Sequence, residues 1–315
     1  MPYIFKEKIT YNQYKNFIEK QVGLSYMQED KWAYVKNNKN HMIVAALKDD
    51  KVCALAHILI KRKRLGYQFY IPNGYIMDFT NKSLLEFFTN EIKLLAQKRR
   101  AYVIDIYPNI DKDEPTKDEI HNNLVSLKYS HINEYLDNSI NIIIPLDRHN
   151  DNDYQEFYLK RGIYFEKTSD TSDINRLKNI INAKYFKYNL VNNLLEQFKD
   201  RVSFVFAKLD LVFYENYLKE NNELDELNKI QELLQISDEI DIGCAIILEP
   251  FAKSNEVCDL LYSTVKESFE SLKVTEGMLN LAIKHCTKKN YKYLKISNVI
   301  LFLISGLVSL MYSTL

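Results

Sequence analysis

The chain has few of the residues that build disulfide or metal scaffolds. Among 315 residues there are four cysteines, six prolines, seven glycines and one tryptophan. The cysteines are Cys53, Cys244, Cys258 and Cys286. They are far apart and form no CxxC pair, which argues against a zinc site or a disulfide framework and suits a reducing, cytoplasmic compartment. We therefore expect four core thiols and no metal.

The chain also lacks net charge, because Lys+Arg 42 balance Asp+Glu 42. A nucleic acid or another anionic partner would have to bind a local basic patch. The strongest one is the run Lys61-Arg62-Lys63-Arg64 before Gly66. It is either a solvated hairpin end or a nucleic-acid contact, and both interpretations stay open. The N-terminus has no basic segment followed by an apolar run, so we expect no signal peptide.

Length and composition favour two globular domains, since 46% hydrophobic content in 315 residues can fill a large core. The polar run 148–153 lies between apolar segments and predicts the domain boundary. We expect a first domain over residues 1–148 and a second over 149–296. The stretch 214–236 is rich in Leu, Glu and Asn, and predicts a short helical insertion in the second domain.

The stretch 67–107 organises the first domain. Alternation over 67–71 predicts a strand, and Pro72-Asn73-Gly74 has the chemistry of a turn. A short strand over 75–79 should follow. Residues 80–83 offer helix caps, and the apolar stripe at helical spacing that begins at Leu84 predicts a helix to about residue 97. The segment 102–107 is typical of a buried strand that ends at Pro108. Strand, turn, strand, helix, strand is the core of an acyl-transfer fold.

A second pattern precedes this stretch. If residues 25–36 form one helix, then Gln28, Trp32 and Lys36 recur every fourth residue and place an amide, an indole and an ammonium along one ridge. Such a ridge could stack on a sugar or base and neutralise a phosphate. The alternative is that Trp32 anchors the core while Lys36 extends its stem to solvent.

With these motifs in this order, the sequence resembles the Fem family of peptidoglycan aminoacyltransferases. The likeness rests on QxxxWxxxK at 28–36, on YIPxG at 70–74 and on the helix and Pro-ended strand that follow, and it covers roughly residues 3–296. It implies an α/β fold of two GNAT-like domains with mixed sheets flanked by helices. It also implies transfer of Gly, Ala or Ser from aminoacyl-tRNA, the co-substrate in place of a cofactor.

The resemblance implies partners and a location as well. The acceptor would be the stem-peptide lysine amine of lipid II or of UDP-MurNAc-pentapeptide, and the product an interpeptide bridge. The protein would be cytoplasmic, with peripheral contact at the inner face of the plasma membrane and association with related transferases. An amine that attacks an ester needs positioning, a proton acceptor and oxyanion stabilisation, so the missing Ser-His-Asp and Cys-His signatures do not count against it.

The family pattern places Lys36 at the phosphates of the precursor. Where the family commonly has Asp-Pro, this chain has Tyr107-Pro108. Asp105 lies two residues earlier on the same strand face, so Asp105 and Tyr107 are the catalytic candidates, with a structural role for Asp105 as the alternative. The further substrate-binding candidates are Trp32, Tyr70, Asn73, Arg161 and Tyr262. The family usually has Arg, Pro and Gly at the positions of Asn73, Tyr75 and Lys128.

Two other functions remain open. A catalytically weakened relative would bind the precursor or partner transferases without turnover, which the altered Asp-Pro and the missing tail lysine favour. An acyl-thioester transferase of the GNAT type is disfavoured, because the chain has no glycine-rich pyrophosphate loop of the type R/Q-x-x-G-x-G/A.

The segment 296–315 carries no charge and is just long enough to span a bilayer, with Lys292 and Lys295 before it. It is a membrane anchor, a strand pair of residues 297–315 that completes the first domain, or an altered end without the family's tail. Polar residues and Gly306 interrupt its hydropathy. We therefore expect it to fold back on the protein.

Overall fold

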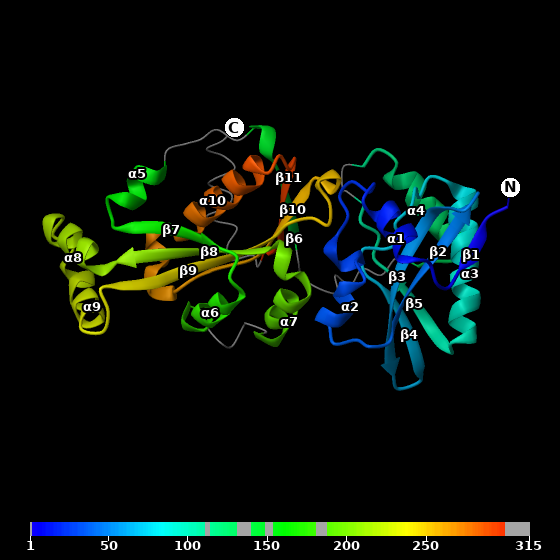
Figure 1. Cartoon of the computed structure of the whole chain (residues 1–315), viewed down its shortest axis with the longest axis horizontal. Coiled ribbons are helices and arrows are strands. Elements are labelled where there is room, and N and C mark those ends of the chain that lie inside the picture. The colour runs from blue at the N-terminus through cyan, green and yellow to red at the C-terminus, as the bar shows by residue number, and fades with distance from the viewer. Residues whose placement is uncertain (1, 111–113, 131–139, 149–153, 181–187, 300–315) are drawn as a thin grey trace. The chain divides into compact units, whose positions relative to one another are not determined.

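The structure is a computed structural model that describes residues 2–110, 114–130, 140–148, 154–180 and 188–299. Its contacts divide the chain into two compact units. The first comprises Met1–Leu136 with Pro250–Asn255, and the second Asp137–Glu249 with Glu256–Leu315. Each unit contains one mixed sheet with helices beside it (Figure 1). The predicted α/β class with two such domains is thereby confirmed.

The first unit has a five-stranded sheet in the order β1-β2-β3-β4-β5. Its strands are β1 (Ile4–Lys6), β2 (His41–Lys48), β3 (Lys51–Lys63), β4 (Gly66–Ile71) and β5 (Ala101–Ile106). Its helices are α1 (Tyr11–Ile18), η1 (Tyr26–Gln28), α2 (Lys31–Val35), α3 (Lys82–Lys98), α4 (Lys117–Ser126) and η5 (Lys253–Asn255). Strands β1 to β4 pair antiparallel, whereas β4 and β5 are parallel. The parallel pair requires a crossover, which α3 supplies.

Helix α3 packs on one face of this sheet because both have an apolar side. Phe69 and Ile71 of β4 lie in the same buried cluster as Phe88 of α3. The helix begins at the predicted place, where the Asn81 side-chain oxygen accepts a hydrogen bond from the Leu84 backbone N–H at 3.2 Å. Since side chains alternate along β4, residues 68 and 70 point to the opposite face, which carries the candidate site.

The second unit has a six-stranded sheet in the order β6-β11-β10-β9-β8-β7. Its strands are β6 (Ile140–Pro145), β7 (Ile163–Thr168), β8 (Val202–Asp210), β9 (Glu239–Leu248), β10 (Val257–Val265) and β11 (Tyr293–Val299). Its α-helices are α5 (Tyr154–Leu159), α6 (Ile174–Ile180), α7 (Tyr188–Phe198), α8 (Leu211–Glu220), α9 (Leu224–Leu234) and α10 (Val274–Lys288). Its 3₁₀ turns are η2 (Leu146–Arg148), η3 (Thr171–Asp173), η4 (Lys199–Arg201) and η6 (Glu267–Leu272).

The two units repeat one topology. Strand β1 is followed by two helices, three antiparallel strands, the crossover α3 and the parallel strand β5. Strand β7 is followed in the same way by α6 and α7, by β8, β9 and β10, by α10 and by the parallel strand β11. Helices α8 and α9 are inserted between β8 and β9. They form a hairpin in which Tyr214 donates a hydrogen bond to Glu226 at 2.7 Å, in the stretch where the sequence predicted a short helical insertion.

Two segments belong to a different unit from the domain to which the sequence assigned them. Residues 140–145 form β6, which pairs with β11 of the second sheet instead of ending the first domain. Residues 250–255 belong to the first unit. Asn255 is fully buried there, and its side-chain amide donates a hydrogen bond to the Ile18 carbonyl at 3.1 Å, which satisfies a carbonyl at the end of α1.

The strand predicted over 75–79 is reduced to a bridge between Ile76 and Leu55. The Asp78 carboxylate accepts a hydrogen bond from the Thr80 backbone N–H at 2.9 Å, and this local turn ends the extended segment.

Within the described ranges, every helix is too short or too polar to cross a membrane. Most of the apolar tail, residues 300–315, lies outside these ranges, so the fold-back interpretation stays a prediction. Residues 297–299 belong to β11 and therefore to the second sheet.

Candidate active site

The predicted catalytic residues meet where the parallel strands β4 and β5 end. Tyr70 and Asp105 are direct partners in the register of the two strands. The amide of Gln68 donates a hydrogen bond to the Asp105 carboxylate. The ring centroids of Tyr70 and Tyr107 are 5.4 Å apart. The structure therefore brings together Tyr70, Asp105 and Tyr107, while their roles in catalysis and binding stay predictions.

Lys61 joins this group from β3, where its register partner is Gln68. Its ammonium lies 3.4 Å from the ring centroid of Tyr70, a close cation–π contact. The sequence analysis counted Lys61 only as part of a basic run. The alternation of β3 places Lys61 on the site face and Arg62 on the other, but the pairing of β3 with β4 was needed to locate it.

A tight turn holds the end of β4 against the end of β5. Gly74 has φ +72, and a Cβ at this position would lie 2.7 Å from Cα of Pro108. Any larger residue would both strain the backbone and displace the segment that follows Tyr107. Asn73 has φ 54, which asparagine tolerates better than most residues. The predicted turn is confirmed, and it fixes the spacing between the two strand ends.

Asn73 uses its polar groups to fasten this turn to η1. Its side-chain amide donates to the Ser25 hydroxyl, and its backbone carbonyl accepts a hydrogen bond from the Gln28 amide at 2.8 Å. Gln28 is buried and also accepts from the Ser25 backbone N–H. In this structure Asn73 positions the turn, and a direct substrate contact by its side chain stays a prediction.

The predicted ridge of Gln28, Trp32 and Lys36 does not form, because Glu29 has an extended backbone (ψ 149) and separates η1 from α2. Trp32 is only 4% exposed, and its ring packs edge-on against Tyr26 at 5.2 Å between centroids. A buried indole cannot stack on a sugar or base. For Trp32 the structure therefore supports the alternative interpretation, that its side chain anchors the core. Lys36 is exposed and its ammonium lies 4.8 Å from the Trp32 ring.

Arg161 and Tyr262 lie in the second unit and are not brought together. The Arg161 guanidinium lies 3.9 Å from the Phe157 ring and 4.9 Å from the Tyr217 ring, and it donates to the Phe157 carbonyl. It therefore joins α5 to α8. Tyr262 lies at a register shift in β10, where burial raises its pKa. Strands β8 and β9 separate β10 from β7.

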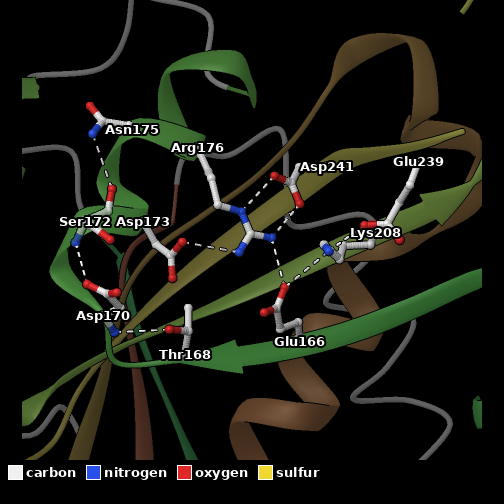
Figure 2. A network of polar contacts seen from close by, with 10 residues as sticks. All are labelled: Glu166, Thr168, Asp170, Ser172, Asp173, Asn175, Arg176, Lys208, Glu239 and Asp241. Carbon is white, nitrogen blue, oxygen red and sulfur yellow. Dashed lines mark hydrogen bonds and ion pairs between the residues drawn. The ribbon is translucent and has the colours of Figure 1, made fainter. Parts of the chain in front are cut away.

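The second unit contains a charged network that sequence reasoning missed (Figure 2). Arg176 of α6 makes a bidentate contact with Asp241 of β9 at 2.9 and 2.7 Å, and contacts Glu166 of β7 at 3.0 Å. The hydrogen bonds that it donates to Asp241 raise the pKa of Arg176. Lys208 completes the group by pairing with Glu239 and Glu166. Because both cations are paired with carboxylates, we interpret the network as the fastening of α6 to its sheet.

Comparison with known proteins matches the first unit to a family. Residues 9–138 match the FemAB family. Two lipid II:glycine glycyltransferases of Staphylococcus aureus, from strains bovine RF122 / ET3-1 and NCTC 8325 / PS 47, are each 24% identical, over 71% of this chain and 59% of theirs. A crystal structure of FemX superposes with a TM-score of 0.72 and 17% identity, over 94% of this chain and 88% of that one. The resemblance to the Fem family is confirmed.

A second solved structure has the same two-domain architecture. A tandem GNAT protein from the clavulanic acid biosynthesis pathway superposes with a TM-score of 0.55 at 7% identity, over 98% of this chain and 94% of that one. The two units of the chain are therefore GNAT-like in fold, as expected. The chain spans about three fifths of the length of the Staphylococcus aureus relatives, 59% of each.

Proposed function

We propose that the chain is an aminoacyltransferase of peptidoglycan precursors, which moves Gly, Ala or Ser from aminoacyl-tRNA to the stem-peptide lysine amine of lipid II or UDP-MurNAc-pentapeptide. The observation that supports it is the pairing of Tyr70 with Asp105 beside Tyr107, within a unit that matches the FemAB family. The names of the Staphylococcus aureus relatives support lipid II as the acceptor and glycine as the first donor to test.

The proposed reaction needs little covalent chemistry. The neutral lysine amine attacks the carbonyl carbon of the aminoacyl ester, the new amide bond forms, and the ester bond to the terminal ribose of the tRNA breaks. The amine loses a proton and the leaving ribose oxygen gains one. Asp105 is suited to accept that proton, because a carboxylate is a sufficient base once the substrate is held in place.

The groups around Asp105 suit the two charges of this reaction. The ring of Tyr107 offers a π face to a substrate ammonium before it is deprotonated. The Lys61 ammonium lies on Tyr70 and supplies positive charge near the place where a carbonyl oxygen would become negative. Gln68 fixes the orientation of the carboxylate. Each of these residues comes from β3, β4, β5 or the residue after β5, so rigid strands position the group.

The alternative is a weakened relative that binds the precursor without transfer. It is favoured by Tyr107, which stands where the family commonly has the carboxylate of Asp-Pro. An acyl-thioester function is less well supported. The N-terminus of α3, where a pyrophosphate would bind, follows Asp78, whose carboxylate accepts hydrogen bonds from the Thr80 backbone N–H and hydroxyl.

One assay separates these functions. Purified protein is incubated with lipid II or UDP-MurNAc-pentapeptide and with tRNA charged with Gly, Ala or Ser, and the acceptor is analysed by mass spectrometry. Added mass of one amino acid, dependent on the charged tRNA, supports transfer. Acceptor binding without added mass for any of the donors supports the weakened relative. Transfer from an acyl thioester in place of aminoacyl-tRNA would refute the proposal.

A further inference from the structure

The turn between β3 and β4 has an unusual combination of charge and apolar exposure. Arg62, Lys63 and Arg64 are exposed, and Leu65 at the tip is 84% exposed. The turn lies at the lower end of the first sheet in Figure 1, where β3 and β4 meet. We call residues 62–65 the basic tip. A leucine this exposed buries almost no apolar surface when the chain folds. Its exposure is explained if a partner outside the chain covers it.

Two further residues extend this surface. The Arg100 carbonyl accepts a hydrogen bond from the Tyr67 backbone N–H at 3.3 Å, so the loop between α3 and β5 lies against the base of the turn. A Cβ at Gly66 would lie 3.5 Å from the Tyr102 ring, which is 52% exposed. The basic tip therefore has a second arginine-bearing loop and an amphipathic ring beside it.

The cations of this surface are not neutralised by the protein. In the part of the chain that the structure describes, no carboxylate forms an ion pair with Arg62, Lys63, Arg64 or Arg100. The adjacent residues Lys98 and Arg99 differ, because both pair with Glu7. The result is a small region with four uncompensated positive charges around an exposed leucine.

We propose that the basic tip docks the first unit on an anionic lipid surface. Phosphate groups of a lipid leaflet would complement the cations, and each Lys or Arg near such a surface contributes about 1 kcal/mol to binding. Leu65 would enter the acyl boundary, and Tyr102 would lie at the level of the headgroups. A nucleic acid would satisfy the cations equally well, but it would leave the leucine exposed. That difference favours lipid.

This docking gives the proposed transferase access to a lipid-linked acceptor, and that consequence rests on the proposed function. The docking itself does not, because binding to vesicles needs neither acceptor nor aminoacyl-tRNA. A chain that binds vesicles but transfers no amino acid would retain this inference and lose the other. A chain that transfers an amino acid but does not bind vesicles would retain the proposed function and lose this inference.

The test measures partition of the full chain onto vesicles by co-sedimentation. The vesicles contain phosphatidylcholine alone or with about 30% phosphatidylglycerol, a lipid with the charge required here. We expect binding to the anionic vesicles that weakens near 1 M salt, where the Debye length falls to about 3 Å. Arg62→Ser with Arg64→Ser should lower the partition coefficient roughly 30-fold, and Leu65→Ser about three- to tenfold.

The chain offers matched controls for both changes. Lys48→Ser with Lys51→Ser removes two exposed charges from the turn at the other end of β3, and Ile236→Ser removes a side chain that is 83% exposed in the second unit. Both should bind vesicles like the unchanged chain. Equal vesicle binding by the tip variants would overturn the proposal. Loss of tRNA binding by the same variants, with vesicle binding unchanged, would also overturn it and assign the tip to nucleic acid.

Discussion

Tyr70 and Asp105 stand opposite each other on the parallel strands β4 and β5, and a bulkier residue than Gly74 would not fit between the turn after β4 and Pro108 after β5. The carboxylate is thus held on a strand, two residues before the position where the family commonly has it. Alternation keeps both positions on the same face. Asp105 can therefore replace the missing carboxylate only if the acceptor amine reaches slightly deeper along β5.

The variant Asp105→Asn tests whether Asp105 replaces the missing carboxylate. An amide cannot accept the proton, so we expect transfer to fall by about 10²- to 10⁴-fold while precursor affinity stays near normal. The fold should survive, because the side-chain oxygen of the new amide still accepts the hydrogen bond that Gln68 now donates to Asp105. The control variant is Asp118→Asn, which makes the same change at an exposed carboxylate on α4. Full activity of the Asp105→Asn variant would reduce Asp105 to a structural residue.

Lys36→Ala tests the predicted phosphate contact. A charge-assisted hydrogen bond contributes about 1.5–3 kcal/mol, so the Kd for UDP-MurNAc-pentapeptide should rise about tenfold or more. Lys36→Arg keeps the charge but changes its geometry and should restore part of the affinity. Lys39→Ala removes an exposed charge three residues away as the control. Calorimetric titration that finds the same Kd for Lys36→Ala and the unchanged chain would place the phosphate site elsewhere.

Local patterns predicted much of the first unit. Alternation indicated β4, an apolar run ended by Pro108 indicated β5, and the apolar stripe that follows the capping residues 80–83 indicated α3, which ends one residue after the predicted end. The break between η1 and α2 was not predictable in this way. It depends on Gln28, whose amide donates a hydrogen bond to the Asn73 carbonyl, 45 residues later. A pattern of residues at helical spacing contains no information about this contact. The burial of Trp32 follows from the same break.

The remaining misses are also long-range. Lys61 reaches the site because β3 and β4 pair in a particular register, which sequence spacing alone does not fix. Strand β6 was assigned to the nearer domain, although its partner β11 lies about 150 residues later. The contact of Asn255 with α1 joins residues 237 positions apart. Each depends on contacts between segments that no local propensity encodes.

Lys128→Gly should stabilise the first unit. Lys128 follows α4 and has φ 64, a left-handed conformation in which a side chain is strained, and the family usually has glycine here. Relief of that strain, about 1–2 kcal/mol, exceeds the entropic cost of the more flexible glycine, about 0.5–1 kcal/mol. Urea denaturation should show a higher midpoint. Asn122→Gly, within the helix itself, should lower the midpoint instead, and a lower midpoint for Lys128→Gly would contradict the prediction.

His57 should make the first unit sensitive to acid. It is 1% exposed, and burial together with its neighbour His41, whose Nδ1 lies 3.4 Å from Nε2 of His57, lowers the pKa of His57 from 6.5 to about 3. Burial lowers the pKa of His41 as well. The unfolded chain binds protons at these groups before the folded chain does. Their stabilising effect is therefore complete above about pH 6.5 and is lost as the pH falls toward 3.

The expected loss from His57 alone is about 1.4 kcal/mol for each pH unit between about 6.5 and 3. Urea denaturation at several pH values, followed through Trp32 fluorescence, reports on the first unit, since the only tryptophan of the chain lies there. His57→Met removes the titrating group and should flatten the dependence between about pH 6.5 and 4. If the His57→Met variant folds and keeps the full slope, another group is responsible, because no residue at position 57 could then be taking up the proton.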